Sequence, residues 1–156
     1  MANDFENILS GIKSVITTNL ATKLTAIETE KGDSIALPDV DASAYAFQTM
    51  DSEAINYDPF IIYGVESVET IPLYGGTAEK LSISVVYVLA DGNRQNISEI
   101  LFRVQRALKE IFEENFTNLD VGNKITVKRF EPVSFQSLDS SARYKAIGII
   151  LETNLA

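Results

Sequence analysis

The stretch from residue 81 to residue 112 constrains the fold more than any other part of the chain. Its first part alternates apolar residues with others, as a strand with one buried face does. A turn segment, Asp91-Gly92-Asn93, then leads into apolar residues at helical spacing. The alternating residues are Leu81, Ile83, Val85, Tyr87 and Leu89, and the helical stripe is Ile97, Ile100, Leu101, Val104, Leu108, Ile111 and Phe112. The pattern predicts a strand, a turn and an amphipathic helix, with Asn96 and Glu99 at the spacing of a capping box.

A second apolar stripe of helical spacing lies near the start of the chain. It predicts a long first helix that begins near Asn3 or Asp4 and ends before Gly32. Gly11 weakens the intrinsic helix propensity by up to about 1 kcal/mol, so we expect packing against a sheet to hold this helix. The stripe consists of Phe5, Ile8, Leu9, Ile12, Val15, Ile16, Leu20, Leu24 and Ile27.

Two β-rich hairpins complete the predicted architecture. Residues 60–71 and the run from Leu81 form the first, separated by Pro72 and Gly75-Gly76. Residues 124–135 and 143–154 form the second, with its turn at 138–141. The simplest arrangement is one α+β domain of residues 1–156, a mainly antiparallel four-stranded sheet with both helices packed on one face, in the order α-β-β-α-β-β. The other face of the sheet would then be uncovered within one subunit, and we expect part of it to be apolar, which suggests an interface. The residues that indicate this are Ile61, Val65, Val86, Val88 and Ile149.

Residues 29–58 show no periodicity and are rich in small and acidic residues, which predicts an extended arm or long loop. Tyr45 and Phe47 are two aromatic anchors inside it, either for the chain's own core or for a neighbouring subunit. A calcium loop is not expected near Asp39, because Ala44 stands where such a loop needs glycine.

The net charge of −9 is unevenly distributed along the chain. Residues 1–59 hold 10 acidic and 3 basic residues, and the remainder holds 12 and 10. The acidic front is either a solvated surface or a negative surface that meets a basic partner or lets DNA pass without binding it. Near the C-terminus, the window 124–145 contains five basic and two acidic residues. The basic residues either protect sheet edges from stray pairing or form a contact surface. They are Lys124, Lys128, Arg129, Arg143 and Lys145.

The composition offers no candidate catalytic, cofactor-binding or metal-ligating residues. There is no histidine and no cysteine among the 156 residues, and no carboxylate pair is identifiable as an acid and base. No apolar run approaches the roughly 18 residues that a membrane span needs, and no signal peptide is recognisable. We therefore expect a non-enzymatic protein without cofactor or membrane anchor, made in the cytoplasm.

The chain resembles the tail terminator proteins of long-tailed bacteriophages over nearly its whole length. The resemblance lies in size and element order: a long N-terminal amphipathic helix, an acidic arm with Pro38, two hairpins and a second helix at 97–112. The most similar runs are Val65-Glu66-Ser67-Val68-Glu69-Thr70 and Leu81-Ser82-Ile83-Ser84-Val85-Val86-Tyr87-Val88. The family implies a ring, typically hexameric, that caps the finished tail tube, stops its polymerisation and provides the surface for joining the head.

The expected partners follow from this resemblance. They are further copies of the chain in a homo-oligomeric ring, the tail-tube protein and a neck or head-completion protein, with DNA passing through without specific binding. The protein would then lie at the head-proximal end of the tail in the virion, assembled in the host cytoplasm. Alternatives are another tail or neck component, such as a tail-tube or head-completion protein, and a cytoplasmic α+β ligand-binding or regulatory domain. Candidate subunit or tube contacts are Tyr45, Phe47, Lys124, Lys128, Arg129, Arg143 and Lys145.

Overall fold

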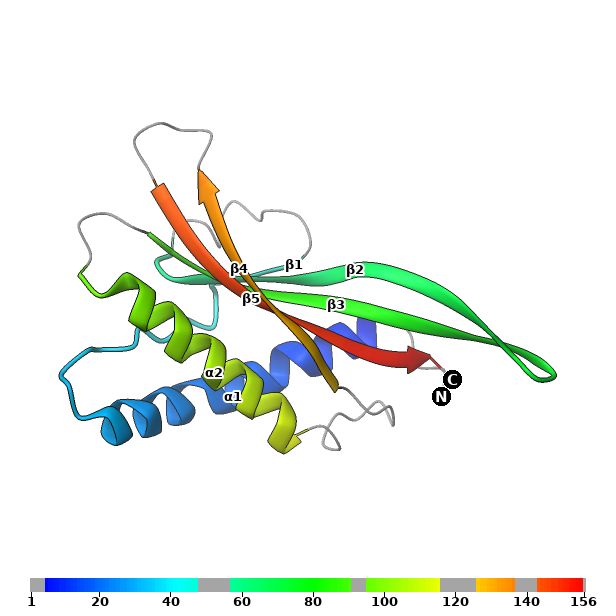
Figure 1. The fold of residues 1–156 in the computed structure, drawn as a ribbon, viewed down its shortest axis with the longest axis horizontal. Coiled ribbons are helices and arrows are strands. Elements are labelled where there is room, and N and C mark those ends of the chain that lie inside the picture. The colour runs from blue at the N-terminus through cyan, green and yellow to red at the C-terminus, as the bar shows by residue number, and fades with distance from the viewer. Residues whose placement is uncertain (1–4, 48–56, 91–94, 116–125, 137–142, 156) are drawn as a thin grey trace.

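A computed structural model describes residues 5–47, 57–90, 95–115, 126–136 and 143–155, with the backbone alone for 126–136 and 143. Two helices and a five-stranded sheet make up the fold, which confirms the α+β class (Figure 1). In chain order the elements are α1 (Phe5–Lys31), β1 (Tyr45–Phe47), β2 (Phe60–Leu73), β3 (Gly76–Ala90), α2 (Ile97–Asn115), β4 (Thr126–Gln136) and β5 (Arg143–Leu155).

The sheet is mixed and has one strand more than the four expected. Its strand order is β1-β2-β3-β5-β4, with antiparallel pairing everywhere except between β1 and β2, which run parallel. The additional strand β1 lies inside the segment predicted to be an arm, where Tyr45 pairs with Ile61 and Phe47 with Tyr63. Three residues are too few to show a reliable alternation, so the sequence pattern missed this strand.

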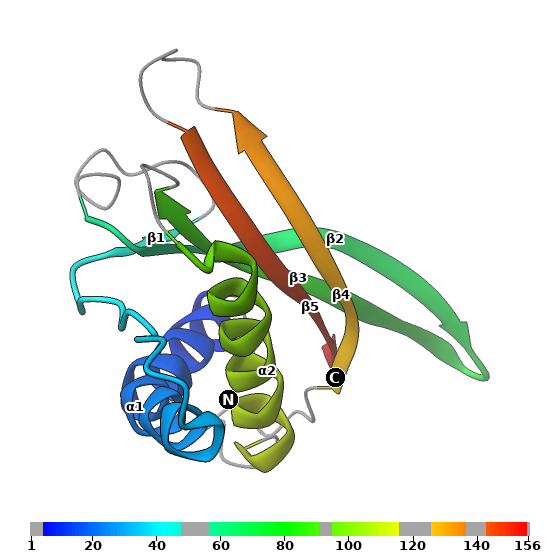
Figure 2. The same ribbon diagram turned by 60° about the vertical axis from the view of Figure 1, so that its left-hand side comes forward.

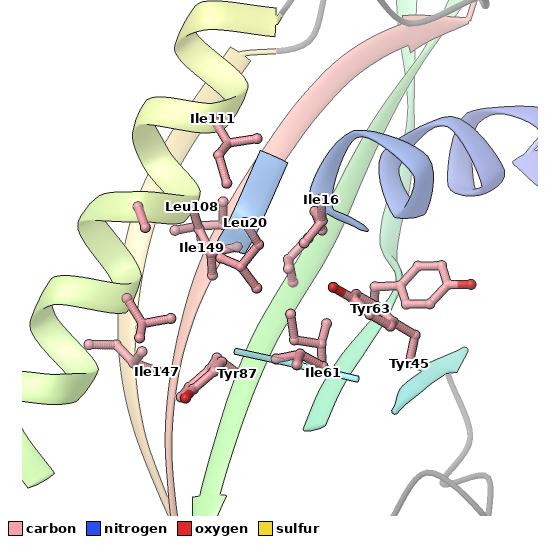
Figure 3. Packing of buried hydrophobic residues seen from close by; sticks show 14 of the residues in the cluster. Ile16, Leu20, Tyr45, Ile61, Tyr63, Tyr87, Leu108, Ile111, Ile147 and Ile149 are labelled. Atoms are coloured by element: carbon pink, nitrogen blue, oxygen red, sulfur yellow. The ribbon is translucent and has the colours of Figure 1, made fainter. Parts of the chain in front are cut away.

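Both helices lie on the same side of the sheet and pack against each other as well as against the strands (Figure 2). The stripe predicted on α2 is buried throughout, and so is the stripe on α1 from Ile8 to Ile27. Leu20 and Leu108 meet Ile149 in the space between helices and sheet, while Ile16 points toward Ile61 (Figure 3). Hydrophobic burial of these side chains is the main stabilising contribution to a fold of this size.

The strand register shows which residues face the helices. Antiparallel partners share a face, so Ile61, Val65 and Ile149, paired with Tyr87, Ile83 and Val85, lie on the helix-covered face. Their assignment to the second face was therefore wrong, because apolar residues on both faces of these strands hid the alternation. The second face does carry Val86 and Val88, as expected, together with Phe60, Tyr144, Ala146 and Ile150.

The first half of segment 29–58 packs on the body instead of extending as an arm. Leu37, Val40 and Ala44 are buried in the core. The Tyr87 hydroxyl donates a hydrogen bond of 2.9 Å to the Pro38 carbonyl oxygen, and the Leu37 amide donates one of 2.9 Å to the Glu28 carboxylate. These contacts correct the expectation for residues 32–47, whereas residues 48–56 lie outside the described part.

The hairpin of β2 and β3 is longer than expected and extends beyond the helices (Figure 1). Pro72 pairs with Thr77 inside the ladder, where a break was predicted, and Tyr74 and Gly75 form the turn between the paired residues Leu73 and Gly76. Gly75 has a φ of +88°, a conformation that strains other residues. We call residues 66–79 the projecting hairpin.

Neither of the two described helices is long and apolar enough to cross a membrane.

The α2 stripe gives the first testable prediction. Leu108 is 0% exposed and Phe102, on the other side of the helix, is 62% exposed. We expect Leu108→Ala to lower the free energy of unfolding by about 2 to 5 kcal/mol, because it leaves a cavity in the core. Phe102→Ala, the matched control, should change it by less than about 0.5 kcal/mol. Denaturant unfolding followed by circular dichroism measures both, and equal losses would contradict the assigned helix face.

Candidate functional site

Among the described residues, no group of three or more histidine, cysteine, aspartate or glutamate side chains is placed to hold a metal ion. The exposed apolar side chains are more informative, because large ones are costly to leave in water and often mark contact surfaces. They concentrate on the projecting hairpin, where Val68, Leu73 and Tyr74 are exposed.

The outer part of the projecting hairpin, residues 71–78, is a ribbon of two strands, because the described pairing of β5 with β3 begins at Glu79. Leu73 is 56% exposed and Tyr74 is fully exposed at the tip. The register places Glu69, Ile71 and Leu73 on one face and Val68, Thr70 and Pro72 on the other. An isolated two-stranded ribbon is at best marginally stable in water. Among the described elements, this outer part of the hairpin has the least support from the rest of the chain.

Charge sets the hairpin apart as well. Residues 66–79 contain Glu66, Glu69 and Glu79 and no lysine or arginine. At its base Lys80 lies 2.7 Å from the Glu152 carboxylate on β5, and this hydrogen bond raises the pKa of Lys80. Lys80 also lies opposite Glu69 in the register of β2 and β3, and the two charges attract each other, so the acidic charge of the hairpin is partly balanced at its base.

The two aromatic residues predicted as contacts occupy different environments. Tyr45 is 8% exposed and belongs to the chain's own core, where burial and the nearby Asp39 carboxylate raise the pKa of its hydroxyl. Phe47 is 46% exposed and makes an edge-to-face contact with Tyr63, with ring centroids 5.9 Å apart. Of the two, Phe47 is the one accessible to another molecule.

The predicted basic residues do not form one patch. Lys128 and Arg129 lie in β4 near the β5 residue Ile150, and the register shift between Val127 and Arg129 leaves Lys128 without a partner position on β5. Arg143 and Lys145 lie toward the other end of the same hairpin, opposite Gln136 and Ser134. Gln136 comes seven residues after Arg129 along β4, a distance of about 23 Å at roughly 3.3 Å per residue. Lys124 is outside the described residues.

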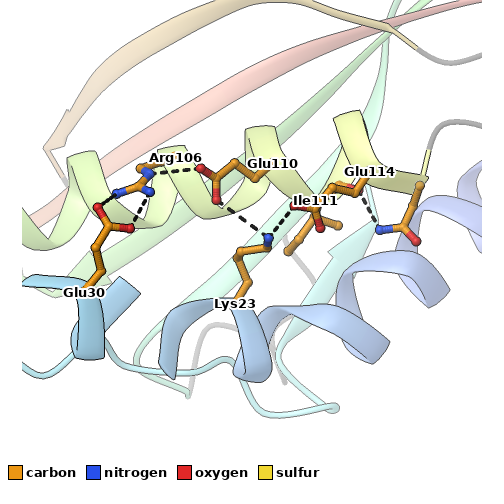
Figure 4. A network of polar contacts seen from close by, with 7 residues as sticks. Lys23, Glu30, Arg106, Glu110, Ile111 and Glu114 are labelled. Carbon is orange, nitrogen blue, oxygen red and sulfur yellow. Dashed lines mark hydrogen bonds and ion pairs between the residues drawn. The ribbon is translucent and has the colours of Figure 1, made fainter. Parts of the chain in front are cut away.

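Ion pairs join α1 and the segment after it to α2 (Figure 4). Arg106 donates two hydrogen bonds to Glu30, of 3.0 and 2.7 Å, and a third of 3.0 Å to Glu110. Lys23 lies 2.7 Å from Glu114 and 3.7 Å from Glu110. Each contact is partly exposed and contributes little alone, but together they fix how the helices lie on one another.

The acidic front takes part in this ion-pair seam, which the sequence did not reveal. Arg103 binds both carboxylate oxygens of Asp33, just beyond the end of α1. Glu30 and Asp33 therefore contact arginines of their own chain, and the basic residues of α2 do not form a free surface for nucleic acid. The spacing of Arg103 and Arg106 places both arginines on one side of α2, but their acidic partners lie 70 or more residues away in the sequence. Local spacing cannot identify partners at such a separation.

The sequence matches no protein-family model and no curated protein.

Asp33 gives a prediction for pH dependence. Its hydrogen bonds from Arg103 lower the pKa of the carboxyl from 3.8 to about 2. Its contribution to stability is therefore complete above about pH 4 and is lost as the pH falls toward about 2. We expect Asp33→Asn to lose this part of the acid dependence, measured as the midpoint of urea unfolding at pH 5, 3 and 2. If the urea midpoint of Asp33→Asn falls with pH as steeply as that of the wild type, the ion pair of Asp33 with Arg103 contributes nothing to stability.

Tyr45 and Phe47 provide a matched pair of substitutions. Tyr45→Ala should lower the free energy of unfolding by about 3 to 5 kcal/mol, as for other large buried aromatic residues. Phe47→Ala removes mainly the edge contact with Tyr63 and should cost no more than about 1.5 kcal/mol. Thermal and denaturant unfolding of the two variants tests the difference, and the reverse order would contradict the register of β1.

Proposed function

We propose that this protein is the tail terminator of a long-tailed bacteriophage, a structural protein rather than an enzyme. Several copies, typically six, form a ring that caps the tail tube, ends its polymerisation and provides the surface for joining the head. The observation that carries the proposal is the projecting hairpin, whose apolar tip lies outside a core that is already complete within one chain.

A ring follows from contacts between unlike surfaces. When a projecting element binds a different surface of the next copy, the interface is heterologous and the assembly closes if the rotation permits. A closed ring of this kind has two different faces, as a protein between tail tube and neck requires. The order of helices and strands in the chain, with β1 added, is compatible with the family resemblance.

The charge distribution supports passage of DNA rather than its retention. Binding to the phosphate backbone requires a lysine or arginine for each neutralised phosphate, and the chain has a net charge of −9. Arg103 and Arg106, the arginines of α2, bind carboxylates of the same chain. A ring built from such subunits would repel phosphates in its lumen, so the DNA would not arrest there.

The decisive experiment removes the protein from the virus that encodes it. We expect the mutant to accumulate filled heads and separate tail tubes of greater and more variable length, counted by negative-stain electron microscopy. Expression of the wild-type chain in trans should restore uniform tails. Native mass spectrometry of the purified protein, alone or mixed with tail-tube protein, should give the mass of a closed ring.

Other outcomes separate the alternatives. Tails of normal length beside heads that have lost their DNA would assign the chain to the neck as a head-completion protein. Absence of tail tubes altogether would make it a tube component. Normal virions, together with a strict monomer that ignores tube protein, would contradict the proposal and favour a regulatory domain.

A further inference from the structure

We propose that two β-bulges form a crease across the sheet that sets the direction of the projecting hairpin, and that this direction permits contact with a neighbouring copy. The first part of the inference concerns one chain alone. The second part rests on the proposed ring.

The first bulge lies at the base of the projecting hairpin. On β2 the register advances by two residues, from Val65 to Ser67. On β3 it advances by one residue over the same step, from Ile83 to Ser82. Glu66 is therefore an extra residue in β2. Such a β-bulge bends the strand that carries it and increases the local right-handed twist.

The second bulge lies on β4 at the same level of the sheet. Lys128 is the extra residue there, because β4 advances by two positions while β5 advances by one, from Leu151 to Ile150. The partner of Leu151 on β3 is Ile83, the residue that stands opposite Val65 on β2. One row of paired residues thus crosses four strands, and each bulge adjoins it. We call this row the crease; it consists of Val65, Ile83, Leu151 and Val127.

Extra residues on both outer strands favour a strongly twisted sheet at the crease. β1 ends opposite Tyr63, so β2 and β4 are the outer strands of the described sheet at this level. Between them, β3 and β5 pair without a register shift from Glu79 to Ala90 of β3. The outer strands of a twisted sheet follow longer paths than the inner ones, and the extra residues supply this length. Figure 2 shows β2 and β3 diverging from β4 and β5 as the hairpin leaves the body.

The crease also marks the point at which the helices cease to cover β2. Residues 60–65 of this strand are buried or partly buried, whereas residues 66–70 are exposed. Seven residue steps lead from Ser67 to Tyr74 at the tip, about 23 Å at roughly 3.3 Å per residue. A change of about 20° in direction, comparable to the twist between neighbouring strands, therefore moves the tip by about 8 Å. The bulge at Glu66 lies where a small bend moves the tip the farthest.

Protection of the sheet edges explains each bulge separately but not their alignment. A bulge interrupts an edge wherever it lies along the strand. Two bulges beside one row have in addition a shared effect on the twist of the sheet. In a ring, the angle at which one copy meets the next decides whether the assembly closes. The proposed ring therefore depends on where the exposed tip residues Leu73 and Tyr74 are directed.

Deletion of Glu66 tests the crease without changing the strand pairing. Ser67 then follows Val65 directly with the same partners on β3, so residues 67–73 keep their faces and the turn at Gly75 is retained. Glu66→Ala is the matched control, because it makes the same change in net charge and keeps the extra residue. Both variants should remain folded in thermal melts, since the buried cluster of the described residues contains no residue of the projecting hairpin.

Insertion of one glycine after Glu66 is the complementary variant. It enlarges the bulge instead of removing it and leaves the pairing on both sides unchanged. It should redirect the hairpin as well, and it decides the question if the deletion variant does not fold.

Double electron–electron resonance measures the direction of the hairpin. The chain contains no cysteine, so nitroxide labels can be placed in pairs at Tyr74→Cys on the tip and at the exposed helix positions Thr18→Cys and Glu113→Cys. We expect at least one of the two tip-to-helix distances to shift by about 5 Å or more in the deletion variant and to keep the wild-type value in Glu66→Ala. The distance between the two helix labels should not change. An excess of the same unlabelled variant restricts the measurement to distances within one chain.

Association tests the second part of the inference. Sedimentation velocity and native mass spectrometry are applied to each variant, alone and mixed with tail-tube protein. The deletion variant should associate at least about tenfold more weakly than the wild type, because a displaced tip loses its anchoring contact. Glu66→Ala should associate like the wild type.

The two parts can fail separately. Wild-type tip distances in the deletion or the insertion variant would overturn the crease. Shifted distances with wild-type association would overturn the dependence of assembly on direction, and equal weakening by Glu66→Ala would assign the effect to charge instead. A wild-type chain that stays monomeric alone and with tail-tube protein would contradict the ring, and the label distances then decide the crease by themselves.

Discussion

The packing of α1 and α2 on the central part of the sheet is the interaction on which the rest of the structure depends. On β3, the alternating residues from Leu81 to Leu89 are completely buried beneath the helices and beside β5. Toward its N-terminus, the part of β3 from Gly76 to Thr77 is exposed and has only β2 as a paired neighbour among the described strands. The buried cluster of the described residues therefore includes no residue of the projecting hairpin.

The acidic residues fall into two groups, those that pair with arginines of α2 and those on the projecting hairpin. Glu30 and Asp33 bind arginines of α2 and hold the segment after α1 against the body. Surface pairs of this kind stabilise weakly. They do neutralise the arginines of α2, which are then not available to bind acidic groups of another molecule. The glutamates of the projecting hairpin lie far along the sheet from this seam, on an element without basic residues.

Much of the fold was predictable because its signals are local and repeated. The α2 stripe from Ile97 to Phe112 and the alternation on β3 extend over several periods, so both elements were correctly identified. Strand β1 was missed because three residues carry no period, and its stability comes from parallel pairing with β2. The contact residues were less predictable: sequence could not distinguish buried Tyr45 from exposed Phe47, nor show that Arg129 and Arg143 lie at opposite ends of one hairpin.

Protection of an edge and docking are compatible roles for the same residues. A bulge, a proline and charged side chains prevent strands of other proteins from adding to β2, and a second register shift lies in β4 next to Lys128. Main-chain pairing accepts almost any extended strand, whereas side-chain docking requires complementary shape and charge. Excluding the first mode would restrict association to surfaces that match in shape and charge. In the ring proposed above, whose contacts would be heterologous, this restriction would favour closure over an open fibre of mispaired sheets.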